Sequence, residues 1–287
     1  MAYQNFIPSV WNEGIERELE RLCVFVEDCN RKYEGQVKKK GESVTILGVG
    51  KPTIKTLSKA NRNNDIDAPE EVEDTSVIMY INQIRYFNYM VGDIDKAQSV
   101  GGVMDALEAE TSEGLADEVD KYVAGFAVDD SVQKLFASPV KVVSGTASTG
   151  EKNVLHILDE AIQKLYENDV KSTTKVVVTV SPRFYTLFKR EYVDKDTDNS
   201  EILKNGRVGK YGSVIVKMSN NVCKTDSGAT DNIMIRTQRA LAFAKPLTHT
   251  EPYRPEKKFA DAVKGYILFD AKVVRPKEVI NINVKYA

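Results

Sequence analysis

The 287-residue chain has few of the residues that usually make disulfides, metal sites or catalytic centres. Its three cysteines, Cys23, Cys29 and Cys223, are too few for a disulfide framework, and no pair has the gap of roughly two to four residues that zinc loops use. Its two histidines, His156 and His249, lie far apart, and neither belongs to a nucleophile elbow or a zincin helix. We therefore expect reduced thiols, no bound metal, no cofactor and no enzymatic activity.

Long apolar runs and charge of one sign are also lacking. No stretch approaches the roughly 18 apolar residues that span a bilayer, and the N-terminus lacks the basic segment and apolar run of a signal peptide. The 40 Lys and Arg residues nearly balance the 42 Asp and Glu residues, which leaves a formal charge of −2. Because there is no basic surplus to neutralise phosphates, a dedicated DNA-binding module is not expected. These patterns predict a chain made in the cytoplasm, with no membrane partner.

Apolar residues recur at helical spacing within residues 1–32. Ile15, Leu19, Leu22 and Val26 share one face of a predicted helix, and the opposite face is charged. The pattern predicts an amphipathic arm with one apolar side. That side either packs on the arm's own domain or covers a neighbouring subunit, and the sequence leaves both interpretations open.

The next segment, residues 33–85, is predicted to be extended. Strand-like pieces at 43–49, 54–57 and 76–82 surround a polar stretch at 61–71. Two strands with a long tip bury too little to be stable alone, and ordering each residue costs about 1 to 2 kcal/mol of backbone entropy. The segment therefore needs a surface outside itself, which is a physical argument for assembly.

A long helix is predicted over residues 102–127. Apolar residues from Val103 and Leu107 to Val123 recur at helical spacing, and the acidic residues, Asp120 among them, are assigned to the remaining surface. A single helix of about 25 residues is roughly 37 Å long.

Helices and strands alternate after Pro139. Ser148 and Glu151 form a predicted capping box before a helix at 151–168, and Ser181 followed by Pro182 predicts the start of a second helix. The expected strands are residues 175–180, 213–218, 233–236, 240–244, 266–269 and 272–274.

Two motifs imitate ligand sites but lack required residues. Residues 145–152 imitate a phosphate-binding loop, yet Glu151 stands where the motif needs Lys, and a carboxylate there repels phosphate. Residues 194–199 carry carboxylates at the spacing of a calcium loop, but Asn199 and Asn205 replace the required Gly and Glu. We interpret the first motif as a helix cap and the second as an acidic turn. A weak cation site at this turn and a cytosolic nucleotide-binding α/β enzyme remain as hypotheses.

Three stretches of the C-terminal part occur in an order that is typical of one protein family. A Gly-punctuated loop and strand at 206–221 ends in Ser-Asn-Asn, a small-residue strand follows at 240–244, and a strand pair at 264–276 closes on Val-Val-Arg-Pro. Near the N-terminus, Phe-Ile-Pro-Ser-Val-Trp at 6–11 and Tyr-Glu-Gly at 33–35 complete the pattern. Together these stretches resemble the major capsid proteins of tailed double-stranded-DNA bacteriophages, which have the Hong Kong ninety-seven-like fold.

The resemblance implies an α+β fold with four parts. These are an N-terminal arm (1–32), an extended β-hairpin loop (33–85), a peripheral domain with a long spine helix (86–127 and 248–287), and an axial domain whose central mixed sheet is flanked by helices (128–247). In that family the extended loop lies on the adjacent subunit.

The resemblance also implies a structural function. The chain is expected to assemble into pentamers and hexamers of an icosahedral head that encloses the phage DNA, and so to reside in the virion after assembly in the host cytoplasm. Because the chain begins directly at the arm, its expected partners include a separate scaffolding protein, or else a fused scaffolding segment is removed. A portal, a possible decoration protein and nonspecifically contacted DNA complete the expected partners. An encapsulin-type nanocompartment shell is the alternative on the same fold.

Ten apolar residues are predicted to contact neighbouring subunits. They come from the arm, the extended loop and the start of the long helix: Trp11, Ile15, Leu19, Leu22, Val26, Ile54, Leu57, Ile66, Val103 and Leu107.

Overall fold

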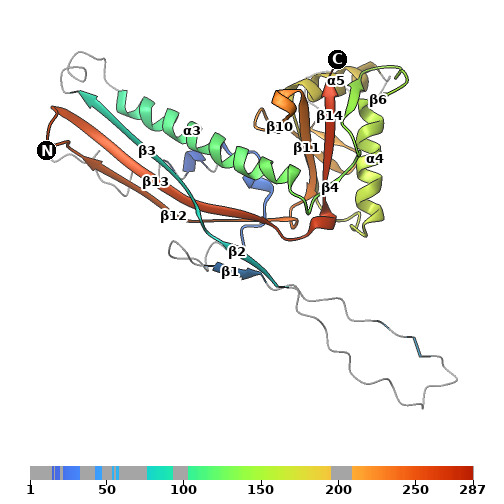
Figure 1. The fold of residues 1–287 in the computed structure, drawn as a ribbon, viewed down its shortest axis with the longest axis horizontal. Coiled ribbons are helices and arrows are strands. Elements are labelled where there is room, and N and C mark those ends of the chain that lie inside the picture. Colours follow the sequence, from blue (N-terminus) through green and yellow to red (C-terminus); the bar gives the residue numbers. More distant parts are fainter. Residues whose placement is uncertain are drawn as a thin grey trace.

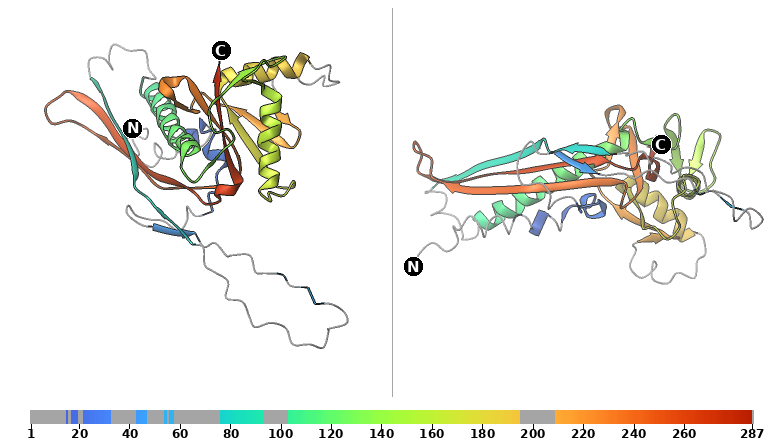
Figure 2. Two further views of the ribbon diagram at one scale, coloured as in Figure 1. Left: turned by 45° about the vertical axis from the view of Figure 1, so that its right-hand side comes forward. Right: turned by 90° about the horizontal axis from the view of Figure 1, so that it is seen from below.

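The computed structural model describes residues 15, 17–19, 22–32, 43–46, 54, 56–57, 76–92, 103–194 and 209–286. These residues form a mixed α+β structure with two main regions (Figure 1). A compact region contains a nine-stranded sheet, and an elongated region contains a three-stranded sheet. Figure 2 shows the hairpin of the elongated region projecting away from the compact one.

The nine-stranded sheet is the centre of the compact region. Its main path runs β6-β5-β14-β11-β7-β9-β8, while β10 pairs with β11 and β4 pairs with β14. The sheet is mixed, since β11 is antiparallel to β14 and β7, whereas β7 and β9 are parallel. The strands are β4 (Gln133–Lys134), β5 (Val140–Val143), β6 (Glu151–Asn153), β7 (Val176–Val180), β8 (Lys210–Tyr211), β9 (Val214–Met218), β10 (Cys223–Thr225), β11 (Thr230–Thr237) and β14 (Val279–Tyr286).

Two strands in the middle of this sheet are buried along their whole length. All five residues of β7 and all eight of β11 are buried. A continuous run of β-branched residues, as in β7, is typical of a strand that is covered on both faces. The predicted strands at 175–180, 213–218 and 233–236 are confirmed by β7, β9 and β11.

Two helices pack in the compact region, α4 (Val154–Glu167) and α5 (Pro182–Asp194). Ser181 caps α5 as predicted, because its Oγ accepts a hydrogen bond from the Phe184 N–H at 3.4 Å. The cap of α4 is Asn153, whose side chain accepts from the Leu155 N–H at 2.8 Å. The predicted capping box is therefore wrong: Glu151 lies in β6, before the helix, and pairs with a lysine.

The elongated region consists of a long helix and three antiparallel strands. The helix α3 (Val103–Gly125) confirms the predicted long helix, and the 3-10 turn η5 (Phe126–Val128) follows it. The sheet has the order β12-β13-β3, with β3 at Gln83–Gly92, β12 at Leu241–Tyr253 and β13 at Ala260–Val273.

One glycine fixes how closely these strands pack. A Cβ at Gly265 of β13 would lie 2.5 Å from the Phe87 ring and 2.7 Å from the His249 carbonyl oxygen. The position therefore admits glycine alone. The strands predicted at 240–244, 266–269 and 272–274 exist, but as parts of the much longer β12 and β13.

The C-terminal strand corrects the predicted domain boundaries. Residues 248–287 were assigned to the part that holds the long helix, but β14 pairs with β11 and β5 in the nine-stranded sheet. Residues 241–247 were assigned to the axial part, but β12 begins at Leu241 in the three-stranded sheet. Both differences arise because strand pairing joins residues far apart in sequence, which local periodicity does not encode.

The remaining described elements are short. β1 (Ser43–Ile46) and β2 (Val77–Tyr80) form an antiparallel pair, and 3-10 turns lie at η2 (Val26–Asp28), η6 (Asp226–Gly228) and η7 (Pro276–Glu278). The stretch 61–71 lies outside the described residues. Among the parts that the structure describes, every helix is too short or too polar to cross a bilayer.

Candidate functional site

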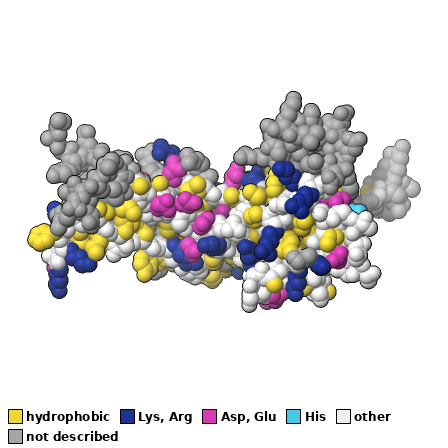
Figure 3. All heavy atoms as spheres, turned by 90° about the horizontal axis from the view of Figure 1, so that it is seen from above, with side chains coloured by type: hydrophobic (Ala, Val, Ile, Leu, Met, Phe, Trp, Pro, Cys, Tyr) yellow, Lys and Arg dark blue, Asp and Glu magenta, His cyan; other side chains and the backbone are white. Residues whose placement is uncertain are grey.

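Four large apolar side chains on β2 and β3 are exposed, and we name them the stripe. Ile78 and Tyr80 of β2 are 44% and 58% exposed, and Tyr86 and Met90 of β3 are 80% and 50% exposed. Successive side chains of a strand point to opposite faces, so Ile78 and Tyr80 share one side of β2, and Tyr86 and Met90 share one side of β3. Figure 3 shows hydrophobic side chains open on the elongated end of the molecule.

The helix α3 covers the opposite face of the sheet. Arg85, an odd-numbered residue of β3, has its Nε 3.7 Å from Glu118 of α3. The strand register places Tyr266 and His249 beside Tyr86, on the face away from α3, and the Tyr266 and His249 rings lie 5.7 Å apart. β1 and β2 pack on one end of this face, where Leu268 and Ala242 are buried together with Val44 and Met79. The rest of it, here named the open face, keeps Tyr86 and Met90 exposed among the residues that the structure describes.

The polar groups of the open face satisfy one another. The Tyr253 hydroxyl donates to Asn88 Oδ1 at 3.0 Å, and Lys264 Nζ lies 3.2 Å from Glu251 and 5.0 Å from the centre of the Tyr253 ring. Antiparallel sheets usually turn a polar face to water, whereas this face adds a row of large apolar side chains. Aromatic residues and methionine on an exposed face are typical of protein–protein interfaces.

The structure separates the predicted contact residues of the arm into two groups. Ile15, Leu19 and Val26 are buried in the chain's own core, so this chain covers them itself. Leu22 is partly exposed, at 37%. Ile15, Leu19 and Val26 therefore fit the interpretation in which the arm packs on its own domain.

The other predicted contact residues have varied positions. Ile54 and Leu57 are exposed, and Leu107 is half-buried on α3. Val103 begins α3, and its side chain lies outside the described residues, as do Trp11 and Ile66. The list of predicted contact residues did not include the stripe, because residues 77–81 and 84–91 carry apolar side chains on both faces and no alternation marks the exposed ones.

A buried polar cluster, here named the clasp, holds residues 22–32 against both regions. Asp120 of α3 accepts hydrogen bonds from the backbone N–H groups of Val24, Phe25 and Val26 at 2.7, 3.1 and 3.4 Å. Asp120 was assigned to the exposed face of the helix, which is wrong: it is buried, on the same face as Val119 and Val123. The Asp120 carboxylate thus accepts hydrogen bonds that backbone carbonyl groups of a neighbouring strand would accept in a sheet.

The other half of the clasp comes from the nine-stranded sheet. Arg236 of β11 is fully buried and donates to the carbonyl oxygens of Asp28 and Phe25 at 2.9 and 2.6 Å. The buried Asp28 carboxylate lies 2.9 Å from Lys175 and 2.5 Å from Lys217. The segment is thus tied to α3 on one side and to the sheet on the other.

The two carboxylates of the clasp have opposite pKa shifts. Burial raises the pKa of Asp120 to about 6, although its three backbone hydrogen bonds act in the other direction. Burial also acts to raise the pKa of Asp28, but the hydrogen bonds from Lys217 and Lys175 outweigh it and lower the pKa. Asp28 is ionised and paired at neutral pH, while Asp120 titrates closer to neutrality.

The motifs that imitate ligand sites gain no support. The Gly145 N–H, the first donor of the loop at 145–152, donates to Glu191 Oε2 at 2.5 Å, so a protein carboxylate occupies it. Residues 195–199 of the acidic turn lie outside the described residues. Within the described parts of the chain, no group of three or more His, Cys, Asp or Glu residues is arranged to hold a metal ion.

Comparisons with known proteins give a consistent answer at the level of fold. No family model matches the sequence, and no curated protein matches it. Solved structures do match: a chain from Mycobacterium phage Che8 has a TM-score of 0.69 at 24% identity, covering 91% of this chain and 90% of that one. The capsid of Cyanophage P-SCSP1u has a TM-score of 0.69 at 15% identity, covering 92% and 88%.

A third match extends beyond phages. The virus-like particle from Pyrococcus furiosus has a TM-score of 0.58 at 10% identity, covering 97% of this chain and 99% of that one. The predicted resemblance is therefore confirmed as a resemblance of fold over nearly the whole chain.

Proposed function

We propose that this chain, which has the fold of tailed-phage capsid structures, is a major capsid protein that assembles into the hexamers and pentamers of an icosahedral head around a DNA genome. The observation that carries the proposal is the stripe, the exposed side chains of Ile78, Tyr80, Tyr86 and Met90 on β2 and β3. A capsid subunit acts by geometry and not by a reaction, so its functional surface is the one its neighbours cover.

The stripe supplies a favourable free energy for assembly. Burying a large apolar side chain is worth roughly 1.5 to 3 kcal/mol, and the stripe presents four. In a closed shell every subunit makes such contacts with several neighbours, so contacts of modest strength combine through multivalency. The polar groups of the open face are already paired, so covering them leaves few unsatisfied donors or acceptors.

The finer parts of the proposal concern organisation and partners. Leu22, Ile54 and Leu57 are exposed and join the stripe as candidate contacts, together with Trp11 and Ile66. The compact region would take the axial position and the elongated region the peripheral one. A scaffolding protein, a portal, a possible decoration protein and nonspecifically bound DNA are the proposed partners, and the mature location is the virion.

An encapsulin-type shell is the second candidate. This candidate is supported by the structural match to a virus-like particle from Pyrococcus furiosus, which extends over nearly the full length of both chains. The two candidates differ in content: a phage head encloses DNA, whereas a nanocompartment encloses a cargo protein.

The decisive experiment is electron microscopy of purified protein with a stripe variant. We expect the unaltered chain to form closed particles and Tyr86→Asp to remain a folded, unassembled subunit, because a carboxylate there would be buried without a partner. Asn88→Asp is the matched control: it lies two residues away on the same face, and its carboxylate can still accept from Tyr253. Particles from Tyr86→Asp in normal yield would contradict the role of the stripe, and an unaltered chain that never assembles would contradict the function itself.

A further inference from the structure

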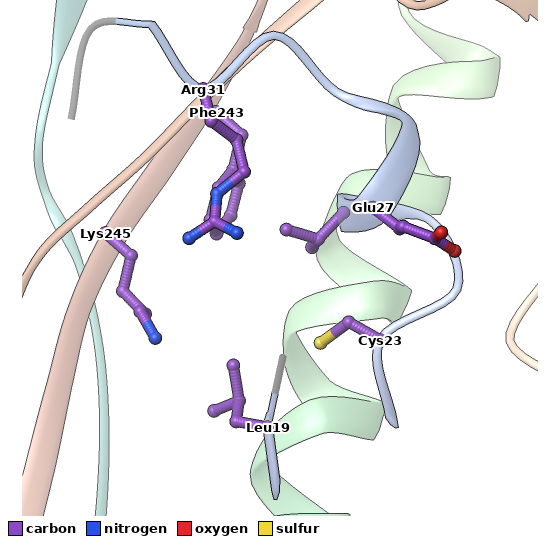
Figure 4. Close-up of a pocket in the computed structure, with 7 residues that line it drawn as sticks. Leu19, Cys23, Glu27, Arg31, Phe243 and Lys245 are labelled. Atoms are coloured by element: carbon purple, nitrogen blue, oxygen red, sulfur yellow. The ribbon is translucent and has the colours of Figure 1, made fainter. Parts of the chain in front are cut away.

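A small pocket lies between the N-terminal segment and β12. Its volume is about 170 Å³, and its apolar walls come from four buried residues: Leu19, Cys23, Val26 and Phe243. Arg31 and Lys245 complete the lining, and Figure 4 shows both side chains directed toward the space between them and Leu19. The pocket is therefore apolar inside and positively charged at its edge.

The one acidic residue of the pocket is held outside it. Figure 4 shows the Glu27 carboxylate pointing away from the space, and Lys217 binds it at 2.6 Å. Lys245 makes no ion pair or hydrogen bond with the residues that the structure describes. The pocket thus offers positive charge beside an apolar cavity, which suits a ligand that is apolar at its centre and anionic at its flanks.

Burial and the charges around the pocket both act on the pKa of the Cys23 thiol. Burial and the nearby Asp120 raise the pKa of Cys23 to about 12, although Lys245 and Arg31 act to lower it. At neutral pH Cys23 is therefore a neutral thiol in the wall of the pocket, and its thiolate fraction grows only as the pH rises.

The sequence contains a segment with the matching chemistry. Residues 65–74, Asp-Ile-Asp-Ala-Pro-Glu-Glu-Val-Glu-Asp, hold six acidic residues and no basic one. Near its start, Ile66 is flanked directly by Asp65 and Asp67. Val72 is flanked in the same way by Glu71 and Glu73, but Ile66 has the larger side chain. A branched aliphatic side chain between two carboxylates complements a small apolar pocket with two cationic side chains.

We propose that this pocket receives Ile66 of a second copy of the chain, with Asp65 and Asp67 of that copy placed against Arg31 and Lys245. The inference deepens the proposed function and rests on it, because the shell brings the segment of one copy to the pocket of another at high effective concentration. It adds a specific contact: an apolar anchor with a charged rim, on the surface formed by the N-terminal segment and β12. Apolar anchors in small pockets with charged rims are typical of residues that dominate an interface.

Cys23 allows a direct test, because it lines the pocket. One chain carries Ile66→Cys together with Cys23→Ser, and it is co-assembled with the unaltered chain. Under a mild oxidant at alkaline pH, we expect a disulfide between the introduced thiol and Cys23 of the unaltered chain, seen as a covalent dimer and identified by peptide mass spectrometry. Because the altered chain lacks Cys23, this link can form only between two chains.

Matched controls define the outcome. Asn63→Cys with Cys23→Ser places a thiol three residues away and should give at most a tenth of the linked dimer, and the unaltered chain alone should give none. Lys245→Glu in the receiving chain should lower the yield of linked dimer about tenfold. Because Arg31 stays cationic, a single reversal in the donor should restore the yield, Asp65→Lys or Asp67→Lys according to which of the two faces residue 245.

The results separate the two proposals. Normal particles without the specific link overturn the pocket assignment and leave the proposed function standing. A separate variant with Ile66→Cys and its own Cys23 tests the opposite case: a link that forms only within this chain at high dilution, and never between chains, also overturns the assignment. Failure of the unaltered chain to form particles counts against the proposed function instead.

Discussion

The compact and elongated regions bury their apolar residues to very different extents. In the compact region, β7 and β11 are buried along their full length, whereas β3, an edge strand of the elongated sheet, has one buried residue, Val91. Of the ten large hydrophobic residues that are exposed in the described parts of the chain, only Val128 and Met218 lie outside the N-terminal segment, the loop and the elongated sheet. The compact region completes its own core, and the elongated region leaves a face for a partner.

The clasp joins these two regions. It contacts α3 through Asp120 and the nine-stranded sheet through Arg236, and the segment between them has little regular structure of its own. The comparison therefore predicts three classes of mutation: those that unfold the chain, those that loosen the connection, and those that affect only assembly.

The largest effect is expected in the compact core. Phe184→Ala removes a fully buried ring from α5 and should lower the free energy of unfolding of the unassembled chain by roughly 4 kcal/mol. Chemical denaturation followed by circular dichroism measures this. A loss below about 1 kcal/mol would mean that the compact region is not the stable half of the molecule.

A smaller loss is expected in the clasp. Arg236→Met keeps the side-chain volume but removes the donors to Phe25 and Asp28, which leaves buried carbonyl groups without partners. We expect a loss of roughly 3 kcal/mol. The rate of amide hydrogen exchange should rise in residues 24–29 and stay low in the strands of the compact sheet. An equal rise across the whole chain would contradict a local role of the clasp.

The pH dependence of the clasp should follow Asp120. Its pKa is about 6 in the folded chain and about 4 when unfolded, so the folded state binds the proton more tightly. Its contribution to stability is therefore greatest below about pH 4 and is lost as the pH rises through 6, by on the order of 2 kcal/mol. Asp120→Asn cannot titrate, so the difference in unfolding free energy between the unaltered chain and this variant should fall over that pH range. A difference that is constant with pH would exclude the shift.

The smallest stability effect is expected on the stripe. Tyr86→Ala removes a side chain that is mostly exposed, so the unfolding free energy of the unassembled chain should change by less than about 0.5 kcal/mol. Particle yield, measured by sedimentation, should nevertheless fall. If Tyr86→Ala destabilised the single chain as much as Phe184→Ala, the contrast between the two regions would be lost.

Local signals in the sequence predicted the helices and the central strands. Ser181 before Pro182 located the start of α5, and the run of valines located β7. The cap of α4 was misplaced because Ser148 and Asn153 both precede the helix and both are good caps. Sequence alone does not say which of two such residues ends the preceding strand.

The features that depend on contacts between distant residues were not predictable in the same way. Asp120 lies on an apolar helix face, and nothing within α3 indicates that the N-terminal segment would bring three N–H groups to it. The pairing of β14 with β11 joins strands about 50 residues apart. β3 carries apolar residues on both faces, so tertiary packing decides which of them α3 covers and which stay exposed.

The connection between β13 and β14 has a mechanical consequence. β13 ends at Val273, the single turn η7 is held by an ion pair of 3.0 Å between Arg275 and Glu278, and β14 then enters the middle of the larger sheet. A force on the hairpin between β12 and β13 is thus transmitted along β13 and the short turn η7 to β14, because no flexible linker separates the two sheets at this point. In a filled shell, strain at the outer tip of one subunit would be shared by the hydrogen bonds of its most rigid part.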